Sequence, residues 1–247
     1  MNPSAVEIEH LSRSFGSFTA VDKITLNVSV GETFGFLGAN GAGKTTTIRM
    51  LCGLLLPTEG KGKVAGFDVY RQSEQIKRTI GYMSQKFSLY SDLTGRENLN
   101  FYGAAYGLSR SRTKVGIAEL SDRLELHEFL DRPSYTLPTG WRQRLALGAA
   151  LLHKPKILFL DEPTSGVDPI FRRRFWALLY DLAEEGVTIF VTTHYMDEAE
   201  YCDRISIMHQ GRIVEMGKPF EIVRNHHQTN LENTFISLIS QQDDNNA

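Results

Sequence analysis

The sequence predicts an α/β fold in which a parallel sheet is preceded by an antiparallel β region and interrupted by an inserted helical subdomain. Three observations support this fold class. A glycine-rich segment at 38–46 joins a short apolar stretch to a segment with helical spacing. Apolar runs at 157–160 and within 188–194 are typical of strands buried on both faces of a parallel sheet. Between these parts, the apolar residues of 87–152 recur at helical spacing.

The N-terminal residues are predicted to form the antiparallel sheet. Segments 5–11 and 24–30 alternate apolar and polar residues, which is typical of strands with one buried face. Residues 12–18 between them are expected to form a loop. Phe15 in this loop has two interpretations, a ring that stacks on an adenine base or a ring that only packs against the protein.

The glycine-rich segment matches G-x-x-x-x-G-K-[ST], the pattern of a phosphate-binding loop. A predicted strand at 33–37 precedes it and a predicted helix at 46–56 follows it, which is the context that the pattern requires. This context disfavours the alternative, a glycine-rich turn that only caps a helix. The residues predicted to bind nucleotide phosphates are Gly38, Ala39, Asn40, Gly41, Ala42, Gly43, Lys44, Thr45 and Thr46.

Each part of this loop has a chemical reason. Glycines let consecutive backbone N–H groups point at phosphate oxygens, and the following helix adds the partial positive charge of its N-terminus. Lys44 is predicted to reach the β- and γ-phosphates, and the Thr45 hydroxyl to ligate Mg²⁺.

Composition limits the class of protein. The chain has 247 residues, 41% hydrophobic and 23% charged, with a formal net charge of −2, as in an ordinary globular protein. This balance argues against a nucleic-acid partner, which normally requires a basic face.

Cys52 and Cys202 lie far apart and are expected to be core thiols of a reducing compartment, rather than a disulfide or a zinc site. The sequence has no signal-peptide core, and its apolar runs are all much shorter than the roughly 18 residues of a membrane span. We therefore expect a cytosolic chain or one attached to a membrane only through another protein.

The remaining elements follow in order. Turn-rich residues 57–71 predict short strands, 80–83 predict a strand that ends at Gln85, and 205–208 with 212–216 predict a final hairpin. Asp168 and Pro169 predict the start of a helix that ends at Gly186. We therefore expect one domain over 1–239, with a core of 1–86 and 153–220, a helical subdomain at 87–152, and a polar, disordered tail at 240–247.

Polar side chains occur where predicted strands of the parallel sheet end. In such sheets ligands bind beyond the carboxyl ends of the strands. Asp161 is predicted to organise Mg²⁺, and the adjacent Glu162 to polarise the water that attacks the γ-phosphate. Gln85 is predicted to complete the shell of the metal and the water. His194 is interpreted either as a hydrogen-bond partner of the γ-phosphate or the water, or as a structural histidine.

With these residues in place, the sequence resembles the ATP-binding cassette (ABC) ATPases over about residues 5–220. The matching motifs are the phosphate loop at 38–46, the Q-loop residue Gln85, the second nucleotide motif at 157–162, the D-loop at 165–168, the switch histidine His194 and the adenine-stacking Phe15. The resemblance implies a P-loop NTPase with a RecA-like core that uses ATP and Mg²⁺. It also implies a head-to-tail cassette dimer, with Asp168 and the helix that begins near Thr139 close to the nucleotides.

One motif departs from the family pattern. The signature expected as Leu-Ser-Gly-Gly-Gln is here Leu137-Pro138-Thr139-Gly140-Trp141. In the family, the serine hydroxyl and the glycine amides hold the γ-phosphate of ATP bound to the other subunit. Pro138 has neither an N–H nor a hydroxyl group, but it suits the first turn of a helix. We hypothesise an altered but working signature in which Thr139 supplies the hydroxyl and Gly140 permits close approach.

Residues 161–169 and 193–200 look most like bacterial export systems for drugs, antibiotics or polymers. This resemblance implies an ATPase subunit on the cytoplasmic face of the inner membrane, paired with separately encoded membrane-spanning subunits and with an identical or different cassette. The segment 90–99 is expected to touch the membrane partner or to pack in the core. The alternative is a cassette that binds ATP with weak or no hydrolysis and regulates an asymmetric pair. A GTPase is disfavoured because the chain lacks Asn-Lys-x-Asp, and a chromosome-organising or translation ATPase because it lacks a long coiled coil and a second cassette.

Overall fold

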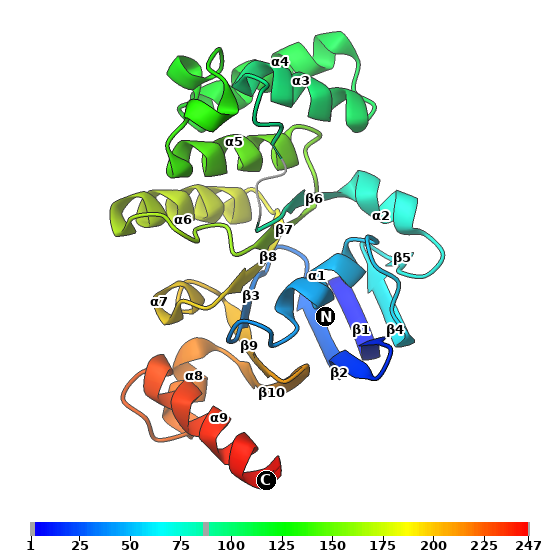
Figure 1. Cartoon of the computed structure of the whole chain (residues 1–247), viewed down its shortest axis with the longest axis vertical. Coiled ribbons are helices and arrows are strands. Elements are labelled where there is room, and N and C mark those ends of the chain that lie inside the picture. The colour runs from blue at the N-terminus through cyan, green and yellow to red at the C-terminus, as the bar shows by residue number, and fades with distance from the viewer. Residues whose placement is uncertain (1–2, 86–88, 247) are drawn as a thin grey trace.

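The computed structural model describes residues 3–85 and 89–246. The strands of one sheet in this part of the chain are β1 (Ser4–Phe15), β2 (Phe18–Ser29), β4 (Glu59–Val64) and β5 (Phe67–Asp68), in the order β2-β1-β4-β5. Those of the other are β3 (Thr33–Leu37), β6 (Ile80–Met83), β7 (Ile157–Asp161), β8 (Thr188–Thr193), β9 (Arg204–His209) and β10 (Arg212–Gly217), in the order β10-β9-β3-β8-β7-β6. The predicted α/β architecture, with an antiparallel sheet beside a mainly parallel one, is confirmed (Figure 1).

The antiparallel sheet contains the predicted strands, but they are longer than expected. Residues 12–18, expected as a loop, belong to β1 and β2 except for a tight turn. Phe15 pairs with Phe18 across this turn, and Gly16 adopts a φ of 60°, which glycine tolerates without a Cβ clash. The polar residues of this stretch hide the strand pattern, because both of its faces are largely open to solvent at the end of the hairpin.

The larger sheet is the centre of the molecule. All residues of β3, β7 and β8 are buried, as the continuous apolar runs predict. Successive side chains of β7 point to opposite faces of the sheet. Phe159 belongs to the hydrophobic cluster that includes the antiparallel sheet, whereas Leu158 and Leu160 belong to the cluster on the other face, which includes the helical subdomain. Strand β3 pairs in parallel with β8 on one side and with β9 on the other, so the segment that follows it starts inside the sheet rather than at its edge.

The helices of the described residues are α1 (Lys44–Leu51), α2 (Ser73–Thr79), α3 (Gly95–Ala105), α4 (Arg110–Arg123), α5 (Thr139–Leu151), α6 (Pro169–Glu184), α7 (Met196–Ala199), α8 (Pro219–Asn225) and α9 (Leu231–Asn246). Two 3₁₀ turns occupy His127–Phe129 and Ser134–Thr136. Helices α3, α4 and α5 lie together at one end of the molecule, and α8 and α9 lie at the other (Figure 1). No helix in the described ranges combines the length and the apolar character needed to cross a bilayer.

Two helix boundaries differ from the predictions. Helix α1 ends at Leu51, not at residue 56, because Gly53 adopts a left-handed φ of 67° and Leu54 beyond it is 47% exposed. Helix α9 continues through residues 240–246, which we expected to be a disordered tail. Its buried Leu231 and Leu238 anchor the helix against the core, and the polar residues extend it.

Candidate functional site

The glycine-rich loop lies between β3 and α1, as predicted. A Cβ atom on Gly38 would lie 2.5 Å from the carbonyl oxygen of Met208, and one on Gly43 would lie 2.5 Å from that of Ala20. Neighbouring backbones therefore leave room only for glycine at both positions. Gly43 also has a φ of 106°, which L side chains rarely adopt. The loop is thus curled by contacts that the rest of the fold imposes.

Lys44 fills the curl of this loop. Its ammonium nitrogen Nζ donates to the carbonyl oxygens of Gly38 at 2.6 Å and of Ala39 at 3.0 Å. The same nitrogen lies 3.4 Å from Oε1 of Glu162, and the Lys44 side chain is only 4% exposed. Burial lowers the pKa of Lys44, and the nearby Glu162 carboxylate opposes that change.

Asp161 lies at the base of the loop, where β7 ends. Its Oδ1 accepts hydrogen bonds from Thr45 Oγ1 at 3.0 Å and from Thr192 Oγ1 at 2.7 Å. Burial raises the pKa of Asp161, and these two hydroxyl groups act in the opposite direction by stabilising the carboxylate. The structure thus brings together Thr45 and Asp161, two of the residues predicted to hold Mg²⁺.

Glu162 connects three other predicted residues. Besides Lys44, its carboxylate contacts Gln85, whose Nε2 donates to Oε2 at 3.0 Å, and His194, whose Nδ1 lies 3.1 Å from Oε2. Gln85 therefore joins the site through Glu162 Oε2, whereas Lys44 contacts Oε1. The backbone of Glu162 is left-handed, with a φ of 50°, which is a strained conformation for a residue with a side chain.

The other predicted residues lie apart from this cluster. Phe15 is 46% exposed, and the guanidinium of Arg13 lies 4.4 Å from its ring centroid. The Asp168 carboxylate caps α6 by accepting from the backbone N–H groups of Ile170 at 3.0 Å and Phe171 at 2.9 Å. The expected helix start at Asp168 is therefore confirmed, whereas a role of its carboxylate at a nucleotide stays a prediction.

The altered signature begins α5. Pro138 occupies the N-cap position, where no side chain accepts from the helix, and Thr139 Oγ1 accepts from Arg142 Nη2 at 3.3 Å. A Cβ atom on Gly140 would lie 2.7 Å from the ring of Phe171, so α6 packs directly onto this glycine. Thr139 is partly exposed at this helix start, whereas Gly140 is buried against Phe171.

Sequence reasoning missed the contacts of Thr192 and Glu198, and it identified Thr193 only as a polar residue at the tip of a strand. Thr192 contacts Asp161, and the buried carboxylate of Glu198 accepts from Thr193 Oγ1 at 2.6 Å and from Thr164 Oγ1. The signal was present, because two consecutive threonines follow the apolar residues 189–191 at the end of the strand. Only the fold, however, shows which carboxylates they face.

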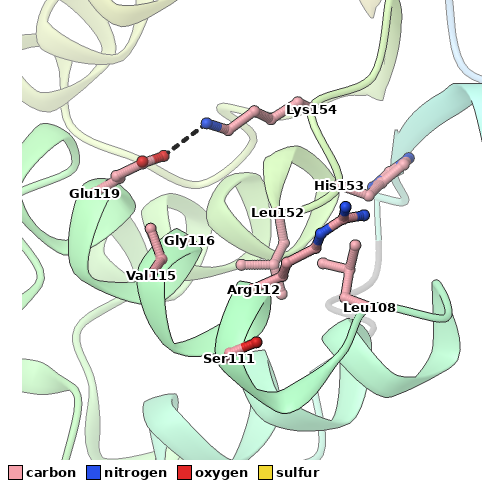
Figure 2. Close-up of a pocket in the computed structure, with 9 residues that line it drawn as sticks. All are labelled: Leu108, Ser111, Arg112, Val115, Gly116, Glu119, Leu152, His153 and Lys154. Atoms are coloured by element: carbon pink, nitrogen blue, oxygen red, sulfur yellow. Dashed lines mark ion pairs between the residues drawn. The ribbon is translucent and has the colours of Figure 1, made fainter.

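A separate hollow of about 460 Å³ lies between α4 and the end of α5 (Figure 2). Glu119 and Lys154 form an ion pair of 2.8 Å at its rim. His153 lines the hollow, stacks on Tyr106 with 3.7 Å between ring centroids, and places its Nε2 2.9 Å from the carbonyl oxygen of Ile80. This hollow shares no lining residue with the predicted nucleotide site.

Comparison with known proteins gives consistent matches. The chain is 45% identical over 245 residues to a probable multidrug ABC transporter ATP-binding protein, YbhF, of Escherichia coli, covering 97% of this chain but 42% of that protein. It is 39% identical over 213 residues to the linearmycin resistance ATP-binding protein LnrL of Bacillus subtilis, covering 86% of this chain and 68% of that protein. It is 40% identical over 219 residues to the daunorubicin/doxorubicin resistance ATP-binding protein DrrA of Streptomyces peucetius, covering 88% and 66%.

Solved structures have the same fold. An ATP-binding subunit of an ABC transporter superposes with a TM-score of 0.85 at 28% identity, covering 95% of this chain and 99% of that one. The dimeric cassette MJ0796, in a post-hydrolysis state bound to ADP and phosphate, has a TM-score of 0.79 at 26% identity, covering 86% and 98%. The family described as ABC transporter matches residues 21–165, which is more than half of the 247 residues. The chain therefore belongs to the ABC transporter family, as an ATP-binding cassette.

Proposed function

We propose that this chain hydrolyses ATP to ADP and phosphate, and that the reaction drives a membrane exporter. The observation that supports this most directly is the contact of one carboxylate, Glu162, with Lys44, Gln85 and His194 beside the glycine-rich loop. These groups are a cation, an amide and an imidazole, which match the needs of phosphoryl transfer to water. Two antibiotic resistance proteins among the relatives make drug or antibiotic export the favoured direction and cargo class.

Nucleotide binding is assigned to the loop and to Lys44. The backbone N–H groups of residues 38–46 and the N-terminus of α1 face the phosphates. Lys44 exchanges its contacts with the Gly38 and Ala39 carbonyls and with Glu162 for contacts with the β- and γ-phosphate oxygens. Those contacts place the ammonium group inside the curl of the loop, where a phosphate group would bind.

The oxygen atoms of Thr45, Asp161 and Gln85 are the ones that would hold Mg²⁺. Hydroxyl, carboxylate and amide oxygens suit this hard cation, and Thr45 and Asp161 already meet within 3.0 Å. Bound there, Mg²⁺ supplies neutralisation of the phosphate charge. Thr45 and Asp161 are set in this position by strand β7 and helix α1.

Glu162 is assigned the role of general base. It accepts a proton from water while the water oxygen forms a bond to the γ-phosphorus, and the bond from that phosphorus to the β–γ bridging oxygen breaks. His194, 3.1 Å from Glu162 Oε2, donates to the γ-phosphate. Phe15 offers an exposed ring for the adenine.

The remaining predicted residues are assigned to a cassette dimer. Thr139 and Gly140, at the start of α5, are assigned to the γ-phosphate held by a second cassette, with Asp168 at the same interface. The membrane-spanning part is assigned to separately encoded subunits, and this chain to the cytoplasmic face of the inner membrane. The chain is assigned to one ATPase domain with α3–α5 as its helical subdomain. Co-purification of a membrane-spanning protein with the chain tests these partners.

A second candidate function is a regulatory cassette that binds ATP and barely hydrolyses it. Pro138 favours this alternative, since it has neither an N–H nor a hydroxyl group to offer the γ-phosphate held by a second cassette. A phosphate-release assay on the purified chain with Mg²⁺ and ATP separates the two functions. Turnover that Glu162→Gln abolishes supports the ATPase, whereas nucleotide binding without turnover supports the regulatory cassette.

A further inference from the structure

Thr192 lies directly behind the two acidic residues of the predicted nucleotide site. It is fully buried in β8, next to β7. Its hydroxyl donates to Asp161 Oδ1 at 2.7 Å and accepts from the backbone N–H of Glu162 at 3.0 Å. The same hydroxyl group therefore donates its proton to the Asp161 carboxylate and accepts a hydrogen bond from the Glu162 backbone.

This arrangement matters because Glu162 has the left-handed φ of 50°. Such a conformation is strained for a residue with a side chain and persists only when surrounding contacts impose it. The N–H of Glu162 also lies 3.2 Å from the Thr192 carbonyl oxygen, so this one residue supplies two acceptors to the strained backbone. Ser165 N–H closes the turn by donating to the Glu162 carbonyl at 3.2 Å.

The next residue along β8, Thr193, makes its hydrogen bonds to a different set of residues. Thr193 Oγ1 donates to the buried Glu198 carboxylate at 2.6 Å and accepts from the backbone N–H of Tyr195 at 3.0 Å. These contacts hold the segment that contains His194. Because successive residues of a strand point to opposite sides, Thr192 is the residue of the pair that faces Asp161 and Glu162.

We propose that the Thr192 hydroxyl is a positioning group for ATP hydrolysis, which holds Glu162 in its left-handed conformation and orients the Asp161 carboxylate. Thr192 is fully buried and its hydroxyl is bonded to Asp161 and Glu162, so it acts through these two neighbours and affects turnover rather than nucleotide affinity. This inference rests on the ATPase function proposed above.

The substitution Thr192→Val tests the hydroxyl alone, since valine keeps the β-branched shape that suits a strand. Thr192→Ser restores the hydroxyl without the methyl group. Thr188→Val is the matched control, because Thr188 is 1% exposed in the same strand and its hydroxyl accepts from Gly31 N–H at 2.9 Å, away from Asp161 and Glu162.

Steady-state phosphate release and the Kd for a fluorescent ATP analogue are measured for all four proteins. We expect Thr192→Val to lower kcat at least about tenfold, as the loss of one hydrogen bond to a charged group predicts, with a Kd within about threefold of wild type. Thr192→Ser and Thr188→Val should stay within about threefold of wild-type kcat.

Four results would contradict the inference. If Thr192→Val hydrolyses ATP like wild type, the hydroxyl does not position the site. If Thr192→Ser is as slow as Thr192→Val, or if Thr188→Val is equally slow, the effect is one of general packing. If the wild-type chain itself releases no phosphate, the proposed function fails first, and the inference fails with it.

Discussion

Replacement of Glu198 by alanine should destabilise the protein strongly, although Glu198 lies outside the nucleotide cluster. Its carboxylate is fully buried, accepts from the hydroxyls of Thr164 and Thr193, and lies 3.3 Å from Arg172 Nε. It therefore joins α7 to the segment after β7, to the end of β8 and to α6. The alanine variant leaves two buried hydroxyls without their acceptor and removes one of the two carboxylates paired with Arg172.

The size of the loss follows from these contacts. Each hydrogen bond to the charged carboxylate contributes about 1.5–3 kcal/mol, and breaking a buried ion pair from one side costs about 3–5 kcal/mol. Arg172 retains Asp197 at 3.1 Å and the face of Tyr195 at 3.9 Å, which limits the total. We expect the free energy of unfolding to fall by about 3–5 kcal/mol, or Tm by about 6–20 °C.

Urea unfolding followed by tryptophan fluorescence measures this change, since Trp176 is buried in the same region. Glu74→Ala is the control, because Glu74 forms an exposed pair with Lys77 and should leave the transition unchanged. A double-mutant cycle with Thr193→Val should show that the two losses are not additive, because both remove the same hydrogen bond. A loss below about 1 kcal/mol, or strict additivity, would refute the idea that the Glu198 contacts stabilise the fold.

Four further predictions concern the site and its surroundings. Glu162→Gln should lower kcat at least about 100-fold while a stable ATP-bound dimer accumulates, which size-exclusion chromatography with ATP detects; normal turnover would remove Glu162 from the role of base. Lys44→Ala should lose nucleotide binding in a titration calorimeter, and unchanged affinity would contradict its role at the phosphates. Gly140→Ala should lower stability by about 1–3 kcal/mol, because its methyl group meets the Phe171 ring 2.7 Å away, and Phe171→Leu in the same chain should recover part of the loss. Burial lowers the pKa of His153, so the unfolded chain binds its proton at a higher pH than the folded chain does; stability should be complete above the ordinary histidine pKa near 6.5 and fall as the pH drops below it, and His153→Gln should flatten that slope in denaturant titrations at pH 5 to 7.5.

Local patterns with fixed chemistry were predicted well. The loop, the buried strands and the helix start at Asp168 each depend on residues close together in the sequence, so glycine spacing, apolar runs and an Asp-Pro pair were sufficient. Strand topology then placed Asp161 and Glu162 beside Lys44 without any need for side-chain detail.

Features that depend on distant contacts could not be predicted. The contact of Gln85 with Glu162 joins residues far apart in the sequence, and Thr192 faces Asp161 only because β7 and β8 are neighbours in one register. Helix α9 was missed because its polar last residues resemble a disordered segment, whereas its helical state depends on Leu231 and Leu238 packing at its start. Residues 12–18 were mistaken for a loop because a hairpin end has no buried face to reveal its alternation.

The two cysteines give the protein a pair of built-in chemical reporters. Both are buried free thiols, and burial raises the pKa of each, so neither forms an appreciable amount of reactive thiolate at neutral pH. Cys52 belongs to the cluster on one face of the larger sheet, and Cys202 to the cluster on the other, where its Sγ lies against Gly35 of β3. Alkylating reagents can therefore reach each thiol only when the structure on its own side of the sheet opens. The labelling rates of the two cysteines thus report the rates of local opening on the two faces separately, without any introduced dye.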